Sequence, residues 1–465
     1  MNASERFCNA YTQHRGTLLG PSGTEHGWLR QLQDKALESF TRQGVPGPGV
    51  ESWKYTRLNQ IEQCDFSRAD YCARPSIHIN PDVLPVCSDS LRLVFINGSY
   101  EAGLSSLSYL PEGIALCSFS EALFRHQKWL SPLLGKIAGD EGHPFAALNA
   151  MLMADGVFLR VAKGTRLQTP IHCLFISTAI DKPIVSSPRL LVELGEQTEV
   201  SLIEHYLASE SLGANGGTGK EQNDSPILAN SLIEVALGRE ARMQHYKLQS
   251  ESSIVSHISG LHVEQQRGSA FSSHNLSLGA GLSRNDIHIK LVEEEAECRL
   301  YGAYCIGGKQ HVDFHTQIDH YKPSCTSREL YKGVIQDRAR AVFNGMVVVH
   351  PDAQGSDAQL VNKNLLLSAK AEVDTKPELQ IYADDVKCGH GATVGQLDPA
   401  ALFYLQTRCI AAKDAQALLV NAFITEILQS MESAAVRQFL QPPVLTQLNA
   451  LIGSTSPMQV KEQRV

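Results

Sequence analysis

Short apolar strands alternate with polar turns over about half of the chain. From Gly156 to about Val394 the strands are rich in Val, Ile, Leu, Tyr and His, and hardly any segment shows the period of an amphipathic helix. Similar charged or glycine-containing turns recur at irregular intervals, at 194–199, 237–242, 292–297 and 336–340. Strands without intervening helices, in repeats of variable length, are typical of a parallel β-helix rather than of a sandwich with evenly spaced hairpins. The pattern predicts a mainly β protein with a parallel β-helix core.

Helical signals flank this core. Before it, 25–41 has helix-like periodicity and 91–96 resembles a single strand, which indicates a mixed α/β, largely helical N-terminal domain. After it, the N-cap aspartate and first-turn proline at 398–399 predict a helix over 400–407, and a second helix is predicted over 413–431. The predicted domains are 1–155, 156–394 and 395–465.

Charge and cysteine usage narrow the class of protein. The 465 residues carry 41 Lys and Arg against 49 Asp and Glu, a net charge of −8, which argues against nucleic acid or an anionic membrane as partner. No apolar run reaches the roughly 18 residues of a membrane span, and the first residues lack the order of a signal peptide, so a cytoplasmic location is expected. The 11 cysteines form no CxxC pair, which favours reduced thiols and argues against a four-cysteine metal site within one chain.

Two short motifs resemble nucleotide-binding loops but differ where phosphate would bind. The Gly-Lys pair at 219–220 looks like the end of a P-loop, yet Ala214 replaces its first glycine and Glu221 replaces the Mg²⁺-binding Ser or Thr. The Gly-Ala-Gly at 279–281 lacks the third glycine and the helix of a dinucleotide fingerprint, so a tight turn is predicted there. The chain is predicted to bind no nucleotide. The polar stretch 207–224 is predicted to be a surface loop that carries no core.

A first candidate metal cluster lies within 311–320. Because side chains alternate along a strand, His311, Asp313 and His315 would share one face. Such a cluster has the chemistry to bind a metal. A polar, hydrogen-bonded ladder on the outer face of the β-helix is the favoured interpretation.

The second candidate is the pair Cys388 and His390. Two residues apart, they would point to the same face of an extended segment, and the small Gly389 and Gly391 leave both side chains accessible. Thiolate and imidazole are ligands that suit iron, iron–sulfur clusters and zinc. Two donors do not close a site, so further ligands would have to come from elsewhere or from another chain. A buried cysteine and a structural histidine are the alternative.

The predicted helix 413–431 has more apolar surface than one partner can cover. Val420, Ile424 and Leu428 lie on one side. A second apolar stripe contains Ala415, Leu418, Leu419, Ala422, Phe423 and Ile427. A helix apolar over so much of its circumference needs two burial partners, of which one would be its own domain and the other a bound protein. Complete burial within this chain is the alternative.

The segment 382–405 closely resembles the signature of the SufB/SufD family. It contains Ala383-Asp-Asp-Val-Lys-Cys-Gly-His-Gly-Ala-Thr-Val-Gly395 and Leu402-Phe-Tyr-Leu405. Upstream, Val342-Phe-Asn-Gly345, the run 357–368 and Thr375-Lys-Pro-Glu-Leu379 are similar to the core of the same family. The resemblance extends from about Gly156 to Phe423. An N-terminal Glu51-Ser-Trp-Lys-Tyr-Thr56 resembles the SufD side of the family, and the additional N-terminal cysteines of SufB-type chains are not seen.

This resemblance implies a fold and a function. The fold is a right-handed parallel β-helix flanked by helical domains. The function is that of a non-enzymatic scaffold subunit of the SUF iron–sulfur cluster assembly system, which pairs with SufB through the β-helices, docks the SufC ATPase on its C-terminal helical region, and supports cluster assembly and iron acquisition. Cys388 and His390 would then lie near the SufB interface and contribute ligands to a transient iron–sulfur cluster shared with SufB.

Other readings stay open at this point. They are a SufB-like primary scaffold, a purely structural subunit without metal ligands, and a homodimer when SufB is absent. A polysaccharide-acting β-helix enzyme is disfavoured by the missing secretion signal. Gln380 and Cys409 also depart from the family pattern, which has Glu and Gly at these positions.

Overall fold

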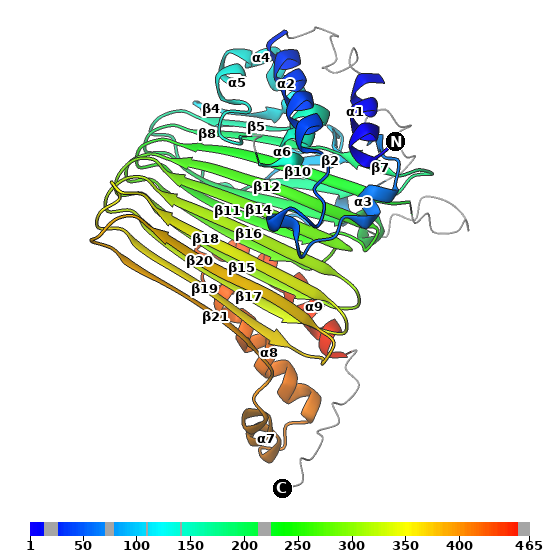
Figure 1. Cartoon of the computed structure of the whole chain (residues 1–465), viewed down its shortest axis with the longest axis vertical. Helices are drawn as coiled ribbons and strands as arrows, with labels where there is room; N and C mark the ends of the chain where they lie inside the picture. The colour runs from blue at the N-terminus through cyan, green and yellow to red at the C-terminus, as the bar shows by residue number, and fades with distance from the viewer. Residues whose placement is uncertain (14–26, 70–78, 108–109, 140–141, 213–224, 454–465) are drawn as a thin grey trace.

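The computed structural model describes residues 1–13, 27–69, 79–107, 110–139, 142–212 and 225–453. Within them the chain winds into a solenoid whose successive turns each add one strand to each of two sheets (Figure 1). The strands stack in parallel along the long axis of the molecule, so the predicted mainly β fold with a parallel β-helix core is confirmed.

The two sheets are built from alternating strands of the sequence. The first, eleven-stranded sheet contains β20 (Glu372–Ile381), β18 (Arg340–Val349), β16 (His311–His320), β14 (Leu282–Leu291), β12 (Val255–Gln265), β10 (Ile227–Leu237), β8 (Arg189–Leu194), β5 (Gly156–Val161) and β4 (Ile114–Ser118), with β7 (Ile184–Ser186) and β1 (Ser67–Arg68) beside β10. The second, ten-stranded sheet contains β21 (Lys387–Gly395), β19 (Asp357–Leu366), β17 (Thr326–Ile335), β15 (Glu297–Ile306), β13 (Ala270–Ser277), β11 (Arg242–Ser250), β9 (Glu199–Ala208), β6 (Ile171–Ser177), β2 (Leu91–Ile96) and β3 (Ser99–Tyr100).

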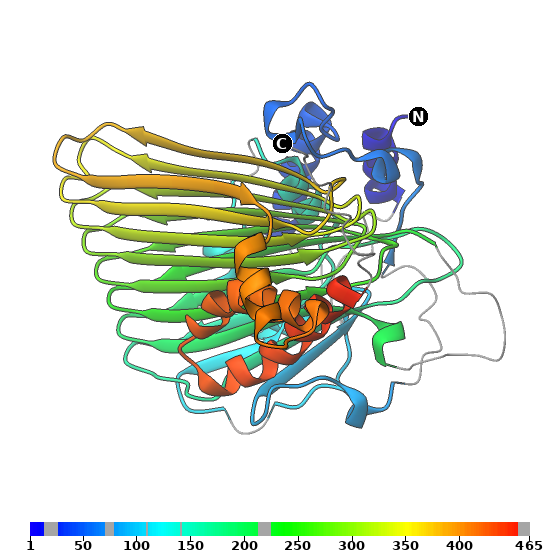
Figure 2. The ribbon, with the colours of Figure 1, turned by 90° about the horizontal axis from the view of Figure 1, so that it is seen from below.

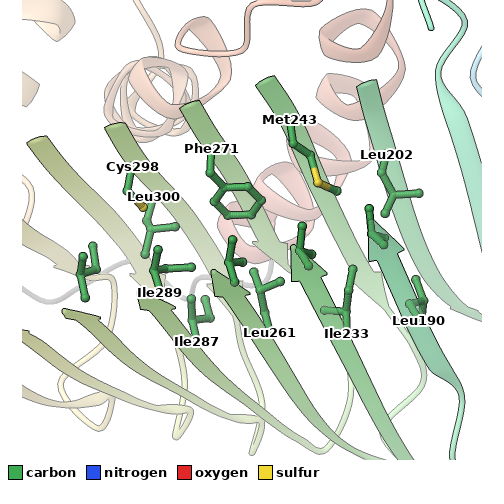
Figure 3. Packing of buried hydrophobic residues seen from close by; sticks show 14 of the residues in the cluster. Leu190, Leu202, Ile233, Met243, Leu261, Phe271, Ile287, Ile289, Cys298 and Leu300 are labelled. Carbon is green, nitrogen blue, oxygen red and sulfur yellow. The ribbon is translucent and has the colours of Figure 1, made fainter. Parts of the chain in front are cut away.

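Alternate residues of every strand fill the space between the sheets, here called the lumen. Figure 3 shows aliphatic side chains of one sheet, such as Ile233 and Leu261, meeting Met243 and Phe271 of the other. These side chains are almost fully buried, and each contributes about 1.5–3 kcal/mol by leaving water. The period of two in the sequence is therefore the alternation between the lumen and the outer faces.

The recurrent polar turns form corners of the solenoid. Each of the four predicted turns contains one non-glycine residue in the left-handed conformation, with φ between 56° and 62° at Gln197, Glu240, Glu295 and Asp337. The Gly-Ala-Gly segment at 279–281 is also a corner, between β13 and β14, with Ala280 at φ 66°. A Cβ on Gly279 would lie 2.3 Å from the Glu251 carbonyl oxygen of the neighbouring coil, which explains the glycine by close approach of backbones and not by a phosphate.

Helices cover both outer faces of the solenoid, and two short strands close its N-terminal end. The N-terminal end is capped by the antiparallel strands β3 and β4. The outer face of the first sheet is covered by α1 (Ala3–Gln13), α2 (Gly27–Gln43) and α6 (Pro144–Leu152). The same N-terminal part of the sequence also contains α3 (Asn59–Gln63), α4 (Phe119–Arg125), α5 (Gln127–Leu133) and the short turns η1 (Glu51–Trp53) and η3 (Pro81–Val83). The second sheet is covered by α8 (Ala412–Gln429) and α9 (Ala434–Gly453), and α7 (Pro399–Thr407) projects beyond it (Figures 1 and 2).

The ends of several helices and loops differ from those expected from the sequence. The helix expected over 25–41 is α2, whose described residues extend to Gln43, and the helix expected over 413–431 is α8, Ala412–Gln429. The loop prediction was wrong at its start, because Leu207 and Ala208 belong to β9 and are buried, followed by the short helical turn η4 (Ser209–Leu212). Residues 213–224, including the Gly-Lys pair, lie outside the described residues. None of the helices in the described ranges is long and apolar enough to cross a bilayer.

Candidate functional site

The last coil of the solenoid differs from all the coils before it. Strands β20 and β21 stand at the ends of their sheets, and in the described part of the chain no further strand pairs with either of them. Not one residue of these two strands is buried, whereas most residues of β18 and half of those of β19 are. The C-terminal end of the lumen is therefore open.

Cys388 and His390 lie at this open end and face the lumen. Their register partners on β19 are Ala358 and Leu360, both fully buried lumen residues, so the two side chains of β21 continue the inner rows. Cys388 is half-buried and packs against the core, while His390 is exposed. The predicted shared face is thus present, and it is the inner face.

The exposure of Cys388 and His390 to solvent affects how each side chain could bind a metal. Burial raises the pKa of the Cys388 thiol; the backbone of Ala358 lowers it and the Asp357 carboxylate raises it further. The thiol is therefore protonated at neutral pH, and binding to a metal would release its proton. His390 is not a buried structural histidine, because its side chain is open to solvent. Among the described residues no three Cys, His, Asp or Glu side chains converge to hold a metal ion.

The other predicted cluster is part of an ion-pair ladder on the outer face of the first sheet. Asp313 is fully buried and lies 2.7 Å from Arg284 and 3.0 Å from His315. Burial alone would raise the pKa of Asp313, but the Arg284 charge and the His315 hydrogen bond hold it well below its usual value. His311 instead lies 3.1 Å from the Thr56 hydroxyl. The hydrogen-bonded ladder, favoured from the sequence, is the arrangement observed.

This ladder anchors the N-terminal motif 51–56 to the solenoid. The Arg284 guanidinium sits 3.7 Å from the centre of the Trp53 ring and donates to the Ser52 carbonyl. Thr56 donates to Asp313, and Lys376 of β20 lies 3.3 Å from Glu51. The motif therefore acts as a strap across strands β14, β16 and β20. Sequence analysis recognised both segments but could not pair them, because more than 200 residues separate them.

Polar side chains also occupy the lumen, which the sequence pattern did not predict. Glu204 accepts hydrogen bonds from Tyr206 at 2.5 Å and pairs with His245 at 2.7 Å, and His245 also lies 2.9 Å from Ser273. Lys247 donates to Ser259 and to a buried asparagine of β14, and burial lowers its pKa to about 8. These groups satisfy one another, so they are explained as a buried network within the described residues.

The C-terminal helices leave apolar side chains exposed on their outer side. Helix α8 packs on the second sheet through a cluster that contains Val420, Ile424 and Leu428, together with Ile427 of the predicted docking stripe. Of that stripe, Ala415 and Ile427 are buried within the chain, Leu419 and Phe423 are half-buried, and Leu418 and Ala422 are exposed. On α7, Phe403 and Tyr404 are 68% and 58% exposed, and sequence analysis had not selected them. The large apolar side chains exposed on these two helices are therefore Phe403, Tyr404 and Leu418.

At position 409 this chain has cysteine where the family pattern has glycine, and the local backbone explains the family's preference. Cys409 follows α7 with φ 63°, and the next residue, Ile410, donates its N–H to the Leu405 carbonyl. This is the left-handed C-cap at which glycine is preferred, so the glycine of the family pattern is explained by backbone conformation. Gln380, on the outer face of β20, donates to Glu378 at 3.2 Å.

Comparison with known proteins identifies the family of this chain. A model of the SUF system FeS cluster assembly SufBD core domain matches residues 175–423, and a model of the SufBD protein N-terminal region matches 1–173. An iron–sulfur cluster assembly SufBD family protein of Synechocystis is 33% identical over 90% of both chains. The iron–sulfur cluster assembly protein SufD of Escherichia coli is 29% identical over 94% of this chain and 95% of its own, and SufD of Bacillus subtilis is 26% identical over 90% and 93%. The chain therefore belongs to the SufB/SufD family of SUF iron–sulfur cluster assembly proteins, and within it is of the SufD type.

Proposed function

We propose that this chain is a scaffold subunit of the SUF system that supports cluster assembly and iron acquisition. It pairs with a SufB chain through its open terminal coil and docks the SufC ATPase on its C-terminal helices. The chain itself catalyses no reaction and binds no nucleotide. The observation that carries the proposal is the position of Cys388 and His390 at the mouth of an uncapped lumen. The expected location of the complex is the cytoplasm.

The open end supports pairing with another β-helix. An uncovered strand edge presents unpaired N–H and C=O groups, and proteins normally cover such edges. Here the N-terminal end is capped by β3 and β4, whereas no strand of the described chain pairs with the outer edges of β20 and β21, whose inner side chains, such as Val373 and Leu379, are half-exposed. A second chain that adds strands to both edges would satisfy the backbone and bury the apolar mouth.

The cluster is cargo in this proposal. Cys388 and His390 supply one sulfur and one nitrogen donor, which are ligand types found on iron–sulfur clusters. The remaining donors would come from the SufB chain across the interface. Placement at a junction between chains lets a cluster form during pairing and leave when the chains separate.

Docking of SufC is supported by the outer side of the C-terminal helices. Phe403, Tyr404 and Leu418 are exposed on α7 and α8, and of these two helices α8 is held to the solenoid by its buried side. Exposed aromatic side chains are enriched at protein interfaces. Leu419, Ala422 and Phe423 border the same surface.

The first experiment is co-expression with SufB and SufC, followed by measurement of subunit stoichiometry, iron and sulfide. His390→Ala is expected to lower iron and sulfide several-fold, with Cys388→Ala acting in the same direction but less strongly, while the melting temperature of the complex stays unchanged. Thr393→Ala is the matched control, because Thr393 is exposed on the same strand but faces outward. If His390→Ala keeps full iron and sulfide, or loses them only because the subunits separate, the ligand role is wrong.

The second experiment tests SufC docking by point substitution. Truncation after Gly395 is unsuitable, because α8 and α9 cover apolar residues of the second sheet such as Tyr246 and Leu276. Leu418→Asp is expected to weaken SufC binding at least 10-fold, whereas Gln429→Asp, on an exposed position of the same helix, is expected to leave it unchanged. Binding is measured by titration of SufC, and equal affinities for the two variants would place the SufC contact elsewhere.

A further inference from the structure

A cavity of about 480 Å³ lies between the first sheet and the N-terminal covering. Its floor is the outer face of the strands from β10 to β20, and its walls are the start of the strap, 51–53, and the first turn of α6. Cavities of this volume commonly bind small molecules. Neither Cys388 and His390 nor the exposed side chains of α7 and α8 line the cavity, so the functions proposed above do not use it.

Three histidine rings line this cavity and lie close to one another. His262 of β12 and His288 of β14 are neighbours in the outer row of side chains that continues from Glu234. His143 directly precedes α6. The centre of the His143 ring lies 5.5 Å from that of His262 and 6.5 Å from that of His288, and the last two are 6.1 Å apart. Side chains of the solenoid and of its covering therefore meet at one place.

His262 has a ring nitrogen without a partner. The residue is 3% exposed, and within the described chain its Nδ1 makes no hydrogen bond. Folded proteins rarely leave such a buried polar atom unpaired, so it marks a position where a bound molecule would supply the missing partner. His288 differs, because its Nε2 already lies 2.6 Å from Asp319. Of these two neighbours, His262 is therefore the one that points to a ligand.

The charges around His262 favour an anion. Burial, followed by repulsion from the other two histidines and from Arg189 and Lys290, lowers the pKa of His262 well below its usual value. The ring is therefore neutral at neutral pH, but a neutral imidazole still donates one N–H. The nearby Asp286 is already paired with Arg284 at 2.8 Å. An anion would thus meet N–H donors in a setting of positive charge.

The first turn of α6 adds the positive end of a helix dipole. Helix α6 is nine residues long, and no side chain caps its N-terminus. The N–H groups at the N-terminus of a helix attract anions, and the same field repels cations. In the described part of the chain no three Cys, His, Asp or Glu side chains are placed to hold a metal ion. An anion therefore fits this group of histidines better than a metal does.

We propose that this cavity binds a small organic anion, whose phosphate or carboxylate group accepts hydrogen bonds from His143, His262 and the first turn of α6. The rest of the molecule lies along the floor, where the outer row continues from His288 to Gln317 and Met346. Both of these side chains are partly exposed. Because the ligand touches the solenoid and its covering together, binding raises the melting temperature of the folded chain.

The test is isothermal titration calorimetry of the full chain with probes that separate the charge from the ring that bears it. Phenyl phosphate and benzoate carry an anionic group on a ring, and phenol has the same ring without the anion. We expect at least one of the two organic anions to bind once per chain with a Kd of about 1 mM or below. Phenol should bind at least about 10-fold more weakly, because it lacks the group that the histidines hold.

The variants locate the binding in the cavity. His262→Gln and His143→Gln are each expected to weaken binding at least about 10-fold, because each removes a donor to a charged group. His274→Gln is the control and should leave binding unchanged. His274 is also a buried histidine with an unpaired Nδ1, but it lies on the second sheet, beside Ser430. His143 is half-buried, so His143→Gln keeps the test decisive if His262→Gln does not fold.

Binding of phenyl phosphate assigns a phosphate site and binding of benzoate a carboxylate site, and either supports the proposal if the two cavity variants weaken it and His274→Gln does not. The proposal is refuted if neither organic anion binds, if phenol binds as tightly, or if the cavity variants bind like the unmodified chain. Binding of Zn²⁺ that His262→Gln abolishes, without binding of either anion, would assign a metal site instead and overturn the proposal. The measurements need neither SufB nor SufC, so their result is independent of the function proposed above.

Discussion

Glu234 connects the solenoid to its N-terminal covering through several buried contacts. Its carboxylate is fully buried on the outer face of β10 and lies 2.6 Å from the Arg189 guanidinium. One oxygen accepts the backbone N–H groups of Ile137 and Ala138 at 3.1 and 3.0 Å, and the other accepts that of Gly135 at 2.9 Å. One side chain therefore satisfies three donors of the connection between α5 and α6 and one buried cation.

Glu234→Gln tests this arrangement with almost no change of shape. The amide oxygen can keep two of the backbone donors, but the amide NH₂ then meets Gly135 N–H and Arg189, which are donors too. Removing one partner of a buried ion pair costs about 3–5 kcal/mol, a large part of the roughly 5–15 kcal/mol that stabilises a folded domain. We expect the free energy of unfolding to fall by that amount.

The control is Glu196→Gln. Glu196 lies 2.7 Å from Lys163, a similar separation, but that pair is exposed and its loss should cost less than about 1 kcal/mol. Adding Arg189→Met to Glu234→Gln removes the unpaired cation and should recover part of the loss. The assay is urea unfolding followed by far-UV circular dichroism and by the fluorescence of Trp28, Trp53 and Trp129, all of which lie in the N-terminal region. Equal unfolding midpoints for Glu234→Gln and Glu196→Gln would refute the reasoning.

Three further outcomes are expected. Cys409→Gly should raise the free energy of unfolding by about 1 kcal/mol in urea titrations, because it removes a left-handed non-glycine residue at the C-cap of α7; an unchanged midpoint would contradict this. Burial lowers the pKa of His205 to about 4 and that of His320 to about 4. These groups take up protons first in the unfolded chain, so stability should be complete above pH 6.5 and fall toward pH 4, by up to about 1.4 kcal/mol per pH unit for each group. His205→Leu should flatten that slope in unfolding measured at pH 7 and pH 5, and an unchanged slope would show that His205 does not titrate in this way. Deleting 213–224 should leave the melting temperature unchanged, because its composition lacks apolar residues to bury; a fall of several degrees would show that this segment contributes to stability.

The sequence alone was enough to predict the β-helix and the relative placement of several side chains. Strand alternation has a period of two, so the shared face of Cys388 and His390 and that of His311, Asp313 and His315 followed directly from their spacing. The charged turns were equally readable, because a coil corner needs a residue that tolerates the left-handed conformation and each of the four predicted turns contains one. Such features depend on neighbouring residues, whose geometry is set by the backbone itself.

Which face is inner and which is outer was decided only by the tertiary structure. Alternation defines two faces but does not say that Cys388 faces the lumen and Asp313 the N-terminal strap. Likewise, the predicted stripe on α8 divides into buried Ile427 and exposed Leu418 because the second sheet, distant in sequence, covers one side of the helix. The exposure of Cys388 and His390 likewise depends on β21 being the last described strand of its sheet. These properties arise from contacts between segments far apart in the chain. Local patterns of hydrophobic and polar residues contain no information about such contacts.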